Sequence, residues 1–309
     1  MSEGSDVLAG IVVYHPNEAH LARLVTAVAP DVREVAVYAN SPVGAALAER
    51  LAQAAGDTPV AVLDPQGNRG LGEAYNALAA RAEAQGDAFL FLLDQDSLPA
   101  PGAVPALAGI FRQLAAAGER PALVGAQPVD AEGAPLPVAA APAGAGAPAR
   151  RARFAYSSGS LVGCAAARAV GPFRADFFID AIDVEWGLRA ADRGHSVWIA
   201  PGVPMRHDLG RGVIRLPLGL TLTDQPPRRL YTFIRNQLAM LRLAHVPPAH
   251  KARTLALMPA RLAVYLVHNR FSREVRRAIG LGLADGLRHR LGPPDRLPPP
   301  SPAGPPGGR

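Results

Sequence analysis

Short apolar runs alternate with stretches in which apolar residues recur every three or four positions over the first 129 residues. The runs predict strands, and the periodic stretches predict helices. Strands are expected at 7–15, 34–40, 59–64, 88–94 and 121–129, and helices at 17–28, 43–56, 71–86 and 103–118. Because these strands lack polar alternation, we predict an α/β fold with a Rossmann-like, mostly parallel sheet flanked by helices.

The pattern changes after this region. Residues 131–150 are rich in Ala, Pro and Gly, which predicts a flexible surface loop. A helix over 181–193 and a following strand restore the α/β pattern, whereas residues 227–291 are helical in periodicity and rich in arginine. Residues 292–309 are rich in Pro and Gly, so we expect them to be disordered. We therefore expect an α/β domain over 1–226, followed by a basic helical C-terminal region.

Charge is distributed unevenly along the chain. The net charge is +6, nearly all of it from arginine, and Lys251 is the one lysine. Most acidic residues precede Glu185, whereas the part from Arg206 onward is rich in arginine. This asymmetry predicts an anionic partner such as a membrane surface for the C-terminal region. A solvated basic face or an oligomer contact is an equally weighted alternative, and no nucleic-acid partner is expected.

The composition also bears on the cellular compartment. With one cysteine, Cys164, the chain cannot form an internal disulfide, and nothing indicates an oxidising environment. The first ten residues lack the layout of a signal peptide, and no apolar window of about 20 residues is uninterrupted. We therefore expect a cytoplasmic protein, with peripheral contact at the inner face of the cell membrane as an open alternative.

The fourth predicted strand ends in two acidic residues, Asp94 and Asp96. A solvated turn with an acidic helix cap would explain the pair, and we favour that interpretation from the three residues DQD alone. However, ligands of parallel α/β sheets bind at the carboxyl ends of the strands. Two clustered carboxylates suit Mg²⁺ or Mn²⁺, whose remaining positions are filled by phosphate oxygens and water. In this context the pair predicts a site for a metal and a diphosphate.

A second acidic cluster opens the helix predicted at 181–193. Asp180 and Asp183 could cap this helix and interact with its dipole, or one of them could serve as a general base. Trp186 lies three residues after Asp183, on the same helix face, where it could stack on a sugar or belong to the core. The sequence leaves both alternatives open.

Three further features carry weaker signals. His207 follows a predicted strand, and it could be a structural histidine or a third metal ligand. The loop around Gly70 could be a phosphate-binding turn or an ordinary loop. Arg235 recurs at seven-residue spacing with Arg228 and Arg242, which is usual for a solvated basic face but also suits diphosphate contact or membrane docking.

Taken in order, seven segments resemble family 2 glycosyltransferases of the GT-A fold, and within them the rhamnosyltransferase-like branch. The segments are VVYHPN, NRGLGEAYNALA, FLLDQDS, SSGSLV, FFIDAIDVEWGLRAADRGH, RHDLG and RLYTFIRN, and they cover residues 8–240 roughly. The combination of DQDS with FID..D.EW and a later histidine is specific, whereas any one segment is not. The resemblance implies an inverting, metal-dependent transfer of a sugar from a nucleotide-diphosphate donor to an acceptor hydroxyl.

The resemblance also implies roles for individual residues. Asp183 matches the base that deprotonates the acceptor, and the Mg²⁺ or Mn²⁺ ligands match Asp96, Asp94 and His207. Positions that match the nucleotide-sugar pocket are Tyr14, Pro16, Asn40, Arg69, Gly70, Asn76, Asp94 and Gln95. Contacts to the acceptor or the diphosphate are expected from Trp186, Asp180 and Arg235.

The sequence departs from the family pattern at Ala39, where the family places an aspartate near the base or ribose. This departure leaves the identity of the nucleotide open. We expect rhamnose transfer from a dTDP-sugar to a surface or cell-envelope glycan, free or lipid-linked. The alternatives are a UDP-sugar donor, as in a hexosyl- or galactofuranosyltransferase, and a non-catalytic membrane-associated relative.

Overall fold

The computed structural model describes residues 6–130, 132–136, 138, 140, 147–207, 213–216 and 221–297. The chain divides into two compact units. The first comprises Met1–Ala175 and Ile182–Asp208, and the second comprises Asp176–Ala181 and Leu209–Arg309. The six-residue segment 176–181 thus interrupts the first unit in sequence but belongs to the second.

The first unit is built on one mixed, mostly parallel sheet of nine strands. Its order is β3-β2-β1-β4-β8-β6-β9-β5, with β7 paired to β9. β1 to β4 run parallel, β8 runs antiparallel to β4 and β6, and β9 runs parallel to β6. The strands are β1 Val7–Val13, β2 Glu34–Ala39, β3 Val60–Leu63, β4 Phe89–Asp94, β5 Ser97–Pro99, β6 Pro121–Val129, β7 Arg150–Ala152, β8 Ser160–Gly163 and β9 Ser196–His207.

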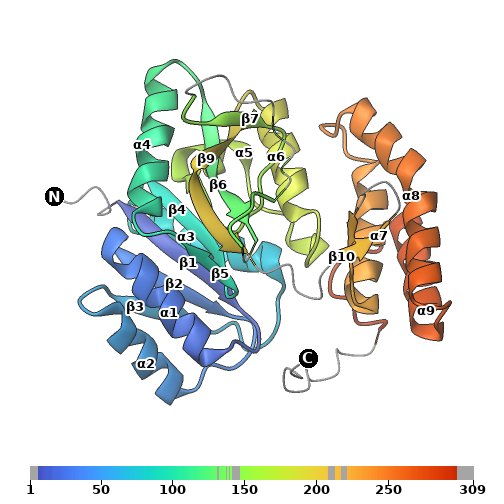
Figure 1. Cartoon of the computed structure of the whole chain (residues 1–309), viewed down its shortest axis with the longest axis horizontal. Helices are drawn as coiled ribbons and strands as arrows, with labels where there is room; N and C mark the ends of the chain where they lie inside the picture. The colour runs from blue at the N-terminus through green and yellow to red at the C-terminus, as the bar shows by residue number, and fades with distance from the viewer. Residues whose placement is uncertain are drawn as a thin grey trace. The chain divides into compact units, whose positions relative to one another are not determined.

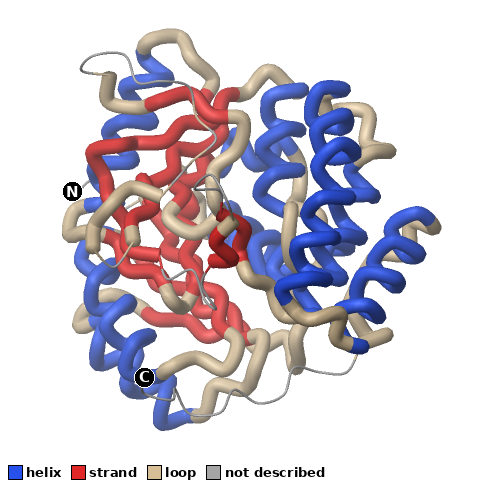
Figure 2. The backbone as a smooth tube through the Cα atoms, turned by 45° about the vertical axis from the view of Figure 1, so that its right-hand side comes forward, coloured by secondary structure: helices blue, strands red, loops and turns tan. Residues whose placement is uncertain are grey.

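Helices cover both faces of this sheet, as Figures 1 and 2 show. One face packs against helices α1, α2 and α4 in the main hydrophobic core. On the other face, Gly10 of β1 lies so close to Leu78 of α3 that a Cβ would approach Leu78 Cδ1 to 2.9 Å. The helices are α1 Glu18–Val28, α2 Ala45–Ala55, α3 Leu71–Ala84, α4 Ala103–Ala116, α5 Cys164–Val170 and α6 Ile182–Asp192, with short 3₁₀ turns at Ala29–Asp31 and Ala175–Phe177. The predicted α/β fold is confirmed.

Local sequence signals account for the helix ends. Asn17 caps α1, since its side chain accepts a hydrogen bond from the His20 N–H at 2.9 Å. Gly56 ends α2 with a φ of 63°, a conformation that favours glycine. Within residues 131–150, part of the predicted flexible loop lies outside the described residues. The described part forms isolated bridges from Val129 to Pro135 and from Ala140 to Ala152.

The described residues of the second unit form one hairpin and three α-helices. It contains β10 Val213–Arg215, β11 Thr221–Thr223, α7 Pro227–Met240, α8 Pro248–His268 and α9 Arg273–Leu287. Its core joins the three helices through Ile234 of α7, Tyr265 of α8 and Ile279 of α9. Across the described residues, no helix combines the length and apolarity that a membrane crossing needs.

The segment that follows α9 differs from its prediction. Composition predicts disorder from residue 292 onward, yet residues 292–297 are described and hold contacts with the rest of the second unit. Arg296 pairs with buried Asp285 at 2.6 Å, and Leu297 is buried. These contacts fix the segment despite its Pro- and Gly-rich composition. Residues 298–309, the rest of the predicted tail, lie outside the described residues.

Candidate active site

The acidic pair lies where β4 ends. Asp94 is the last residue of β4 and is half-buried, whereas Asp96 is exposed in the two-residue turn before β5. The Asp94 backbone N–H donates a hydrogen bond to Ser158 Oγ at 2.8 Å, and Ser158 Oγ lies 2.7 Å from Ser97 Oγ. Because both serines are buried, their hydrogen bonds stabilise the turn between β4 and β5 on its interior side.

His207 ends β9, and its backbone is paired with that of Ser97. The register therefore places the His207 backbone across from the residue that follows Asp96. Only the backbone of His207 is described, so its role as a metal ligand stays a prediction.

The donors at this turn suit a divalent cation that is shared with a substrate. Among the described residues, no group of three or more His, Cys, Asp and Glu side chains forms a metal-binding cluster. Mg²⁺ commonly takes only one or two protein carboxylates and completes its octahedron with phosphate oxygens and water. The Asp94 and Asp96 carboxylates therefore fit the protein's part of such a site.

Tyr75 of α3 interacts with Asp94 and is affected by the charge of Asp183, which lies in the first turn of α6. The Tyr75 hydroxyl donates a hydrogen bond to Asp94 Oδ1 at 3.4 Å. Burial, followed by the negative charges of Asp94 and then Asp183, raises the pKa of Tyr75 well above its ordinary value. After burial, Asp183 also raises the pKa of Tyr156. Two acidic groups that are 89 positions apart in the sequence thus act on one phenol.

Asp183 lies at the start of its helix, where the helix dipole favours a carboxylate. Its Oδ1 accepts a hydrogen bond from the Val184 N–H at 2.8 Å. Asp183 also lines a small cavity with Leu92, Ser157 and Ser160. Asp183 can therefore stabilise the start of α6, as the capping alternative predicts. Its carboxylate also lies near β4, so a role as a general base is compatible with that placement.

The end of β1 is tied directly to the acidic turn. Gln95 accepts a hydrogen bond from the Tyr14 N–H through Oε1 at 2.7 Å and donates one from Nε2 to the Tyr14 carbonyl at 3.2 Å. The Tyr14 ring is 39% exposed, so it is available to a ligand. The next residue, His15, donates its N–H to Ser41 Oγ at 2.7 Å, and Pro16 is half-buried. The predicted pocket residues Tyr14, Pro16 and Gln95 thus lie together.

The end of β2 is tied to the loop before α3. Asn40 accepts a hydrogen bond from the Arg69 N–H at 2.8 Å and donates one to the Gly70 carbonyl at 3.4 Å. Gly70 has a φ of 85° and precedes α3. Ala39, the residue that departs from the family pattern, is 1% exposed in β2. The predicted positions Asn40, Arg69 and Gly70 therefore form one connected strand-end network.

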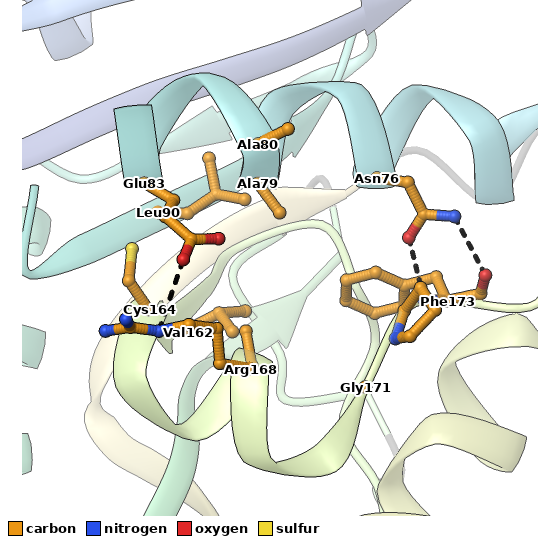
Figure 3. A pocket seen from close by; sticks show the side chains of 12 residues that line it. Asn76, Ala79, Ala80, Glu83, Leu90, Val162, Cys164, Arg168, Gly171 and Phe173 are labelled. Atoms are coloured by element: carbon orange, nitrogen blue, oxygen red, sulfur yellow. Dashed lines mark hydrogen bonds and ion pairs between the residues drawn. The ribbon is translucent and has the colours of Figure 1, made fainter. Parts of the chain in front are cut away.

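Asn76 lies at one end of a cavity of about 290 Å³ between α3 and α5, shown in Figure 3. Its amide forms two hydrogen bonds with the Phe173 backbone, at 2.9 Å and 2.7 Å. Glu83 and Arg168 are paired at 3.4 Å at the other end. Buried Cys164 also lines the cavity, and burial raises the pKa of its thiol to about 11, which makes it a poor nucleophile. The donor-binding role of Asn76 stays a prediction, since the structure gives its amide a structural partner.

The three predicted acceptor or diphosphate contacts are all in the interior. Trp186 is 1% exposed, donates its Nε1–H to the Gly171 carbonyl and stacks on Phe173 with a centroid distance of 5.0 Å. The Asp180 carboxylate pairs with Arg229 at 2.6 Å, and Arg235 is fully buried. The geometry thus favours the core interpretation of Trp186 and structural roles for Asp180 and Arg235 over substrate contact.

Sequence reasoning gave no role to Tyr75 or Ser158. Tyr75 is one of the buried residues of α3, and a tyrosine among buried small residues and leucine is a signal for an internal hydrogen bond. Ser158 belongs to the SSGSLV segment. The serines of this segment follow no periodic pattern that would assign them a place in the fold. Their partners, Asp94 and Ser97, come from distant parts of the sequence and could not be paired with them from sequence alone.

Comparison with known proteins bears on this site. Residues 11–136 match the model of the family described as Glycosyl transferase family 2. A curated relative, the dTDP-rhamnosyl transferase RfbF of Shigella flexneri, is 29% identical over 132 residues. That alignment covers 43% of this chain and 44% of the relative, less than half of either.

Solved structures agree on the fold. S. aureus TarS 1–349 in complex with UDP-GlcNAc has a TM-score of 0.59 and 13% identity, over 92% of this chain and 81% of that one. The mannosyltransferase PcManGT of Pyrobaculum calidifontis, in complex with GDP-Man and Mn²⁺, has a TM-score of 0.55 and 12% identity, over 92% and 88%. At these identities the likeness concerns the GT-A-like fold alone. Residues 11–136 are thus similar to Glycosyl transferase family 2, and the solved structures show that the chain shares their GT-A-like fold.

Proposed function

We propose that the protein is an inverting, metal-dependent glycosyltransferase that moves a sugar from a nucleotide-diphosphate donor to an acceptor hydroxyl. The sugar is proposed to be rhamnose from a dTDP donor, and the acceptor a surface or cell-envelope glycan. The name of the Shigella flexneri relative supports this donor. The GT-A-like neighbours solved with UDP-GlcNAc and with GDP-Man and Mn²⁺ support the nucleotide-sugar class and the use of a cation.

One observation carries the proposal: the Tyr75 hydroxyl donates a hydrogen bond to Asp94 at the end of β4, and Asp183 lines a small cavity with Leu92 of the same strand. Both carboxylates also raise the pKa of Tyr75. An acidic group that binds donor and cation must lie near the group that activates the acceptor, since the two substrates react with each other. The two carboxylates come from different elements, β4 and α6, and their shared effect on the pKa of Tyr75 supports the proposal. If the two aspartates only capped helices, they would not need to lie near each other.

Each residue has a distinct part in the proposed reaction. Asp94 and Asp96 hold the donor's diphosphate end through Mg²⁺ or Mn²⁺, which when bound supplies neutralisation of the leaving group's charge. The nucleotide part of the donor is bound by Tyr14, Asn40 and Gln95, which follow β1, β2 and β4. These roles follow the strand-end positions that the three residues occupy.

The chemical step is a single displacement. Asp183 removes the acceptor hydroxyl's proton while that oxygen attacks the anomeric carbon from the face opposite the nucleoside diphosphate. A bond forms between the acceptor oxygen and the anomeric carbon as the bond to the leaving phosphate oxygen breaks. The configuration is therefore inverted, and no covalent enzyme intermediate is needed.

We also propose that the acceptor is presented at a membrane, as a lipid-linked glycan would be, on the cytoplasmic face. Support comes from the charge of the second unit: residues 221–297 contain 14 Arg and Lys residues against four Asp and Glu residues. A positive surface favours the neighbourhood of anionic lipid.

Nucleotide binding tests the donor site. Calorimetry should detect binding of dTDP or another nucleoside diphosphate that strengthens on addition of Mn²⁺. Asp96→Ala should remove the dependence on Mn²⁺, since it deletes an exposed carboxylate that supports no described contact of the fold. Binding that responds to Mn²⁺ equally in Asp96→Ala and the wild type would contradict the assignment.

The choice of donor is tested separately. A panel of dTDP-rhamnose, UDP-hexoses, UDP-galactofuranose and GDP-mannose should give donor hydrolysis or transfer with dTDP-rhamnose. Ala39 leaves the end of β2 without the family's acidic residue, so a UDP-sugar is the main competing donor. Turnover with a UDP-sugar alone would replace the proposed donor, and turnover with none would favour a non-catalytic relative.

A further inference from the structure

Helix α8 of the second unit presents an apolar face to solvent. It spans 21 residues, and the side chains of Met258 and Tyr265 are buried in the core of the unit. Seven of its exposed apolar residues recur at helical spacing and lie on one face, whereas exposed Leu257 lies outside that face. We call this the α8 outer face, and it consists of Ala252, Leu255, Ala256, Pro259, Ala260, Ala263 and Val267.

The α8 outer face is long and exposed. Leu255 and Val267 are 56% and 65% exposed, and the face runs about 22 Å along the helix at 1.5 Å per residue. Seven large apolar side chains are prominently exposed among the described residues, and five of them lie between residues 255 and 287. Exposed apolar side chains thus gather in the second unit, with α8 carrying the largest share.

Positive charge surrounds this face. α8 contains Lys251, Arg253 and Arg261 and no acidic residue. Arg253 beside the face and Arg270 and Arg273 just beyond its end are exposed. None of these three has an ion pair within the described part of the chain, although Glu274, also exposed, follows Arg273. Two other acids of the unit have partners: Asp285 pairs with Arg296, and Asp224 lies 4.0 Å from His268.

We propose that the α8 outer face docks on a membrane leaflet that contains anionic lipid. The proposed function includes contact with a membrane, and this inference rests on that contact and names the surface that makes it. An apolar helix face with flanking cations lodges at the boundary between headgroups and acyl chains, while its cations attract anionic headgroups. Because residues 221–297 have a net charge of +10, a second copy of the same surface would be repelled. The charge therefore favours anionic lipid over a symmetric dimer.

Vesicle co-sedimentation of the full chain tests the proposal. The protein should bind vesicles of phosphatidylcholine mixed with phosphatidylglycerol and should not bind phosphatidylcholine alone. Raising the ionic strength from about 0.1 M to about 1 M shortens the Debye length from ~10 Å to ~3 Å and should weaken binding. No binding to the anionic vesicles at the lower ionic strength would overturn the proposal.

Two matched variants locate the surface. Val267→Asp places a charge on the α8 outer face and should reduce vesicle binding by roughly tenfold or more. Leu287→Asp places the same charge at a residue of α9 that is 63% exposed, against 65% for Val267, and should leave binding within about threefold. Because both side chains are exposed, both variants should keep the wild-type circular dichroism. An equal loss of binding in the two variants would contradict the choice of α8.

A charge variant and a size measurement complete the test. Replacing Arg253, Arg270 and Arg273 by Gln should lower binding by about fivefold for each cation. If light scattering instead shows a dimer that Val267→Asp dissociates, without binding to anionic vesicles, the face joins two copies and the lipid proposal is wrong. Hydrolysis of a soluble donor should be unchanged in all these variants, so failure here is distinct from failure of the proposed chemistry.

Discussion

Replacing Asn236 should release the segment 176–181 that the second unit holds. The Asn236 side chain is fully buried, and its Nδ2 lies within hydrogen-bond distance of the carbonyls of Phe177, Ile179 and Asp180, at 3.0, 2.8 and 2.9 Å. Arg235 donates from Nη2 to the Phe177 carbonyl at 2.9 Å and from Nε to Asn236 Oδ1 at 3.0 Å. Two adjacent polar side chains of α7 thus bind the backbone of one short segment.

The segment needs this support because its backbone is strained. Phe178, Asp180 and Ala181 have φ values of 64°, 69° and 63°, and none of them is glycine. Such a conformation costs an L-residue about 1–2 kcal/mol. The chain continues from Ala181 directly into Ile182 and Asp183, so the backbone of this segment leads into the proposed base.

The magnitude follows from the hydrogen bonds. In Asn236→Ala the carbonyls of Ile179 and Asp180 lose their side-chain donor, and each buried polar group left unpaired costs about 1–3 kcal/mol. Local relaxation recovers part of this cost, so we expect the free energy of unfolding to fall by about 2–4 kcal/mol. The turnover number should fall as well, with nucleotide affinity unchanged.

Hydrogen exchange and urea unfolding measure the effect. Amides of residues 177–182 should exchange faster in Asn236→Ala. Gln237→Ala is the control, because the neighbouring Gln237 is half-buried and its one described hydrogen bond, from Thr254, is long at 3.4 Å. The reasoning is refuted if Asn236→Ala and Gln237→Ala unfold within about 0.5 kcal/mol of each other and the segment exchanges at the wild-type rate.

Two further predictions concern stability. Gly159→Ala should destabilise the protein by about 1–3 kcal/mol more than Gly102→Ala in urea unfolding. Both glycines have positive φ, but a Cβ at Gly159 would overlap Met205 Sδ, whereas a Cβ at Gly102 would meet no atom within 4 Å. Equal losses of stability would show that packing is not the cause. Burial chiefly raises the pKa of Tyr265 to about 12, so its contribution to stability is complete below pH ~10 and is lost as the pH rises toward 12. The unfolding temperature of Tyr265→Phe should therefore fall less steeply above pH ~10 than that of the wild type. Parallel pH profiles for the two proteins would count against the raised pKa.

Much of the first unit could be predicted because its signals are local. The apolar run of β4 ends at Asp94 as expected, and Asn17 caps α1 from its own side chain. The predicted helix over 181–193 corresponds to Ile182–Asp192, with Asp183 in its first turn. Strand and helix periods, caps and glycine stops are carried by neighbouring residues, so one sequence is enough to find them.

The remainder depends on contacts between distant residues. A basic, amphipathic pattern predicts that Arg235 faces solvent, whereas the structure buries it and pairs it with the carbonyls of Phe177, 58 positions earlier, and Gly292, 57 positions later. Positive φ at Phe178 and Asp180 could not be predicted either, since neither residue is glycine. The three-residue strands β5 and β7 are too short for a period to be visible, yet β5 sets the register that places His207 across from Ser97.

The central claim is that Asp183 acts as the base beside a donor site at Asp94 and Asp96. The most direct measurement compares the wild type with Asp183→Asn, a variant of nearly equal volume, for nucleotide binding and for turnover of the same donor. We predict that nucleotide affinity stays within about threefold while turnover falls by about 10²–10⁴-fold, the usual contribution of a general base. Wild-type turnover in Asp183→Asn would contradict the account.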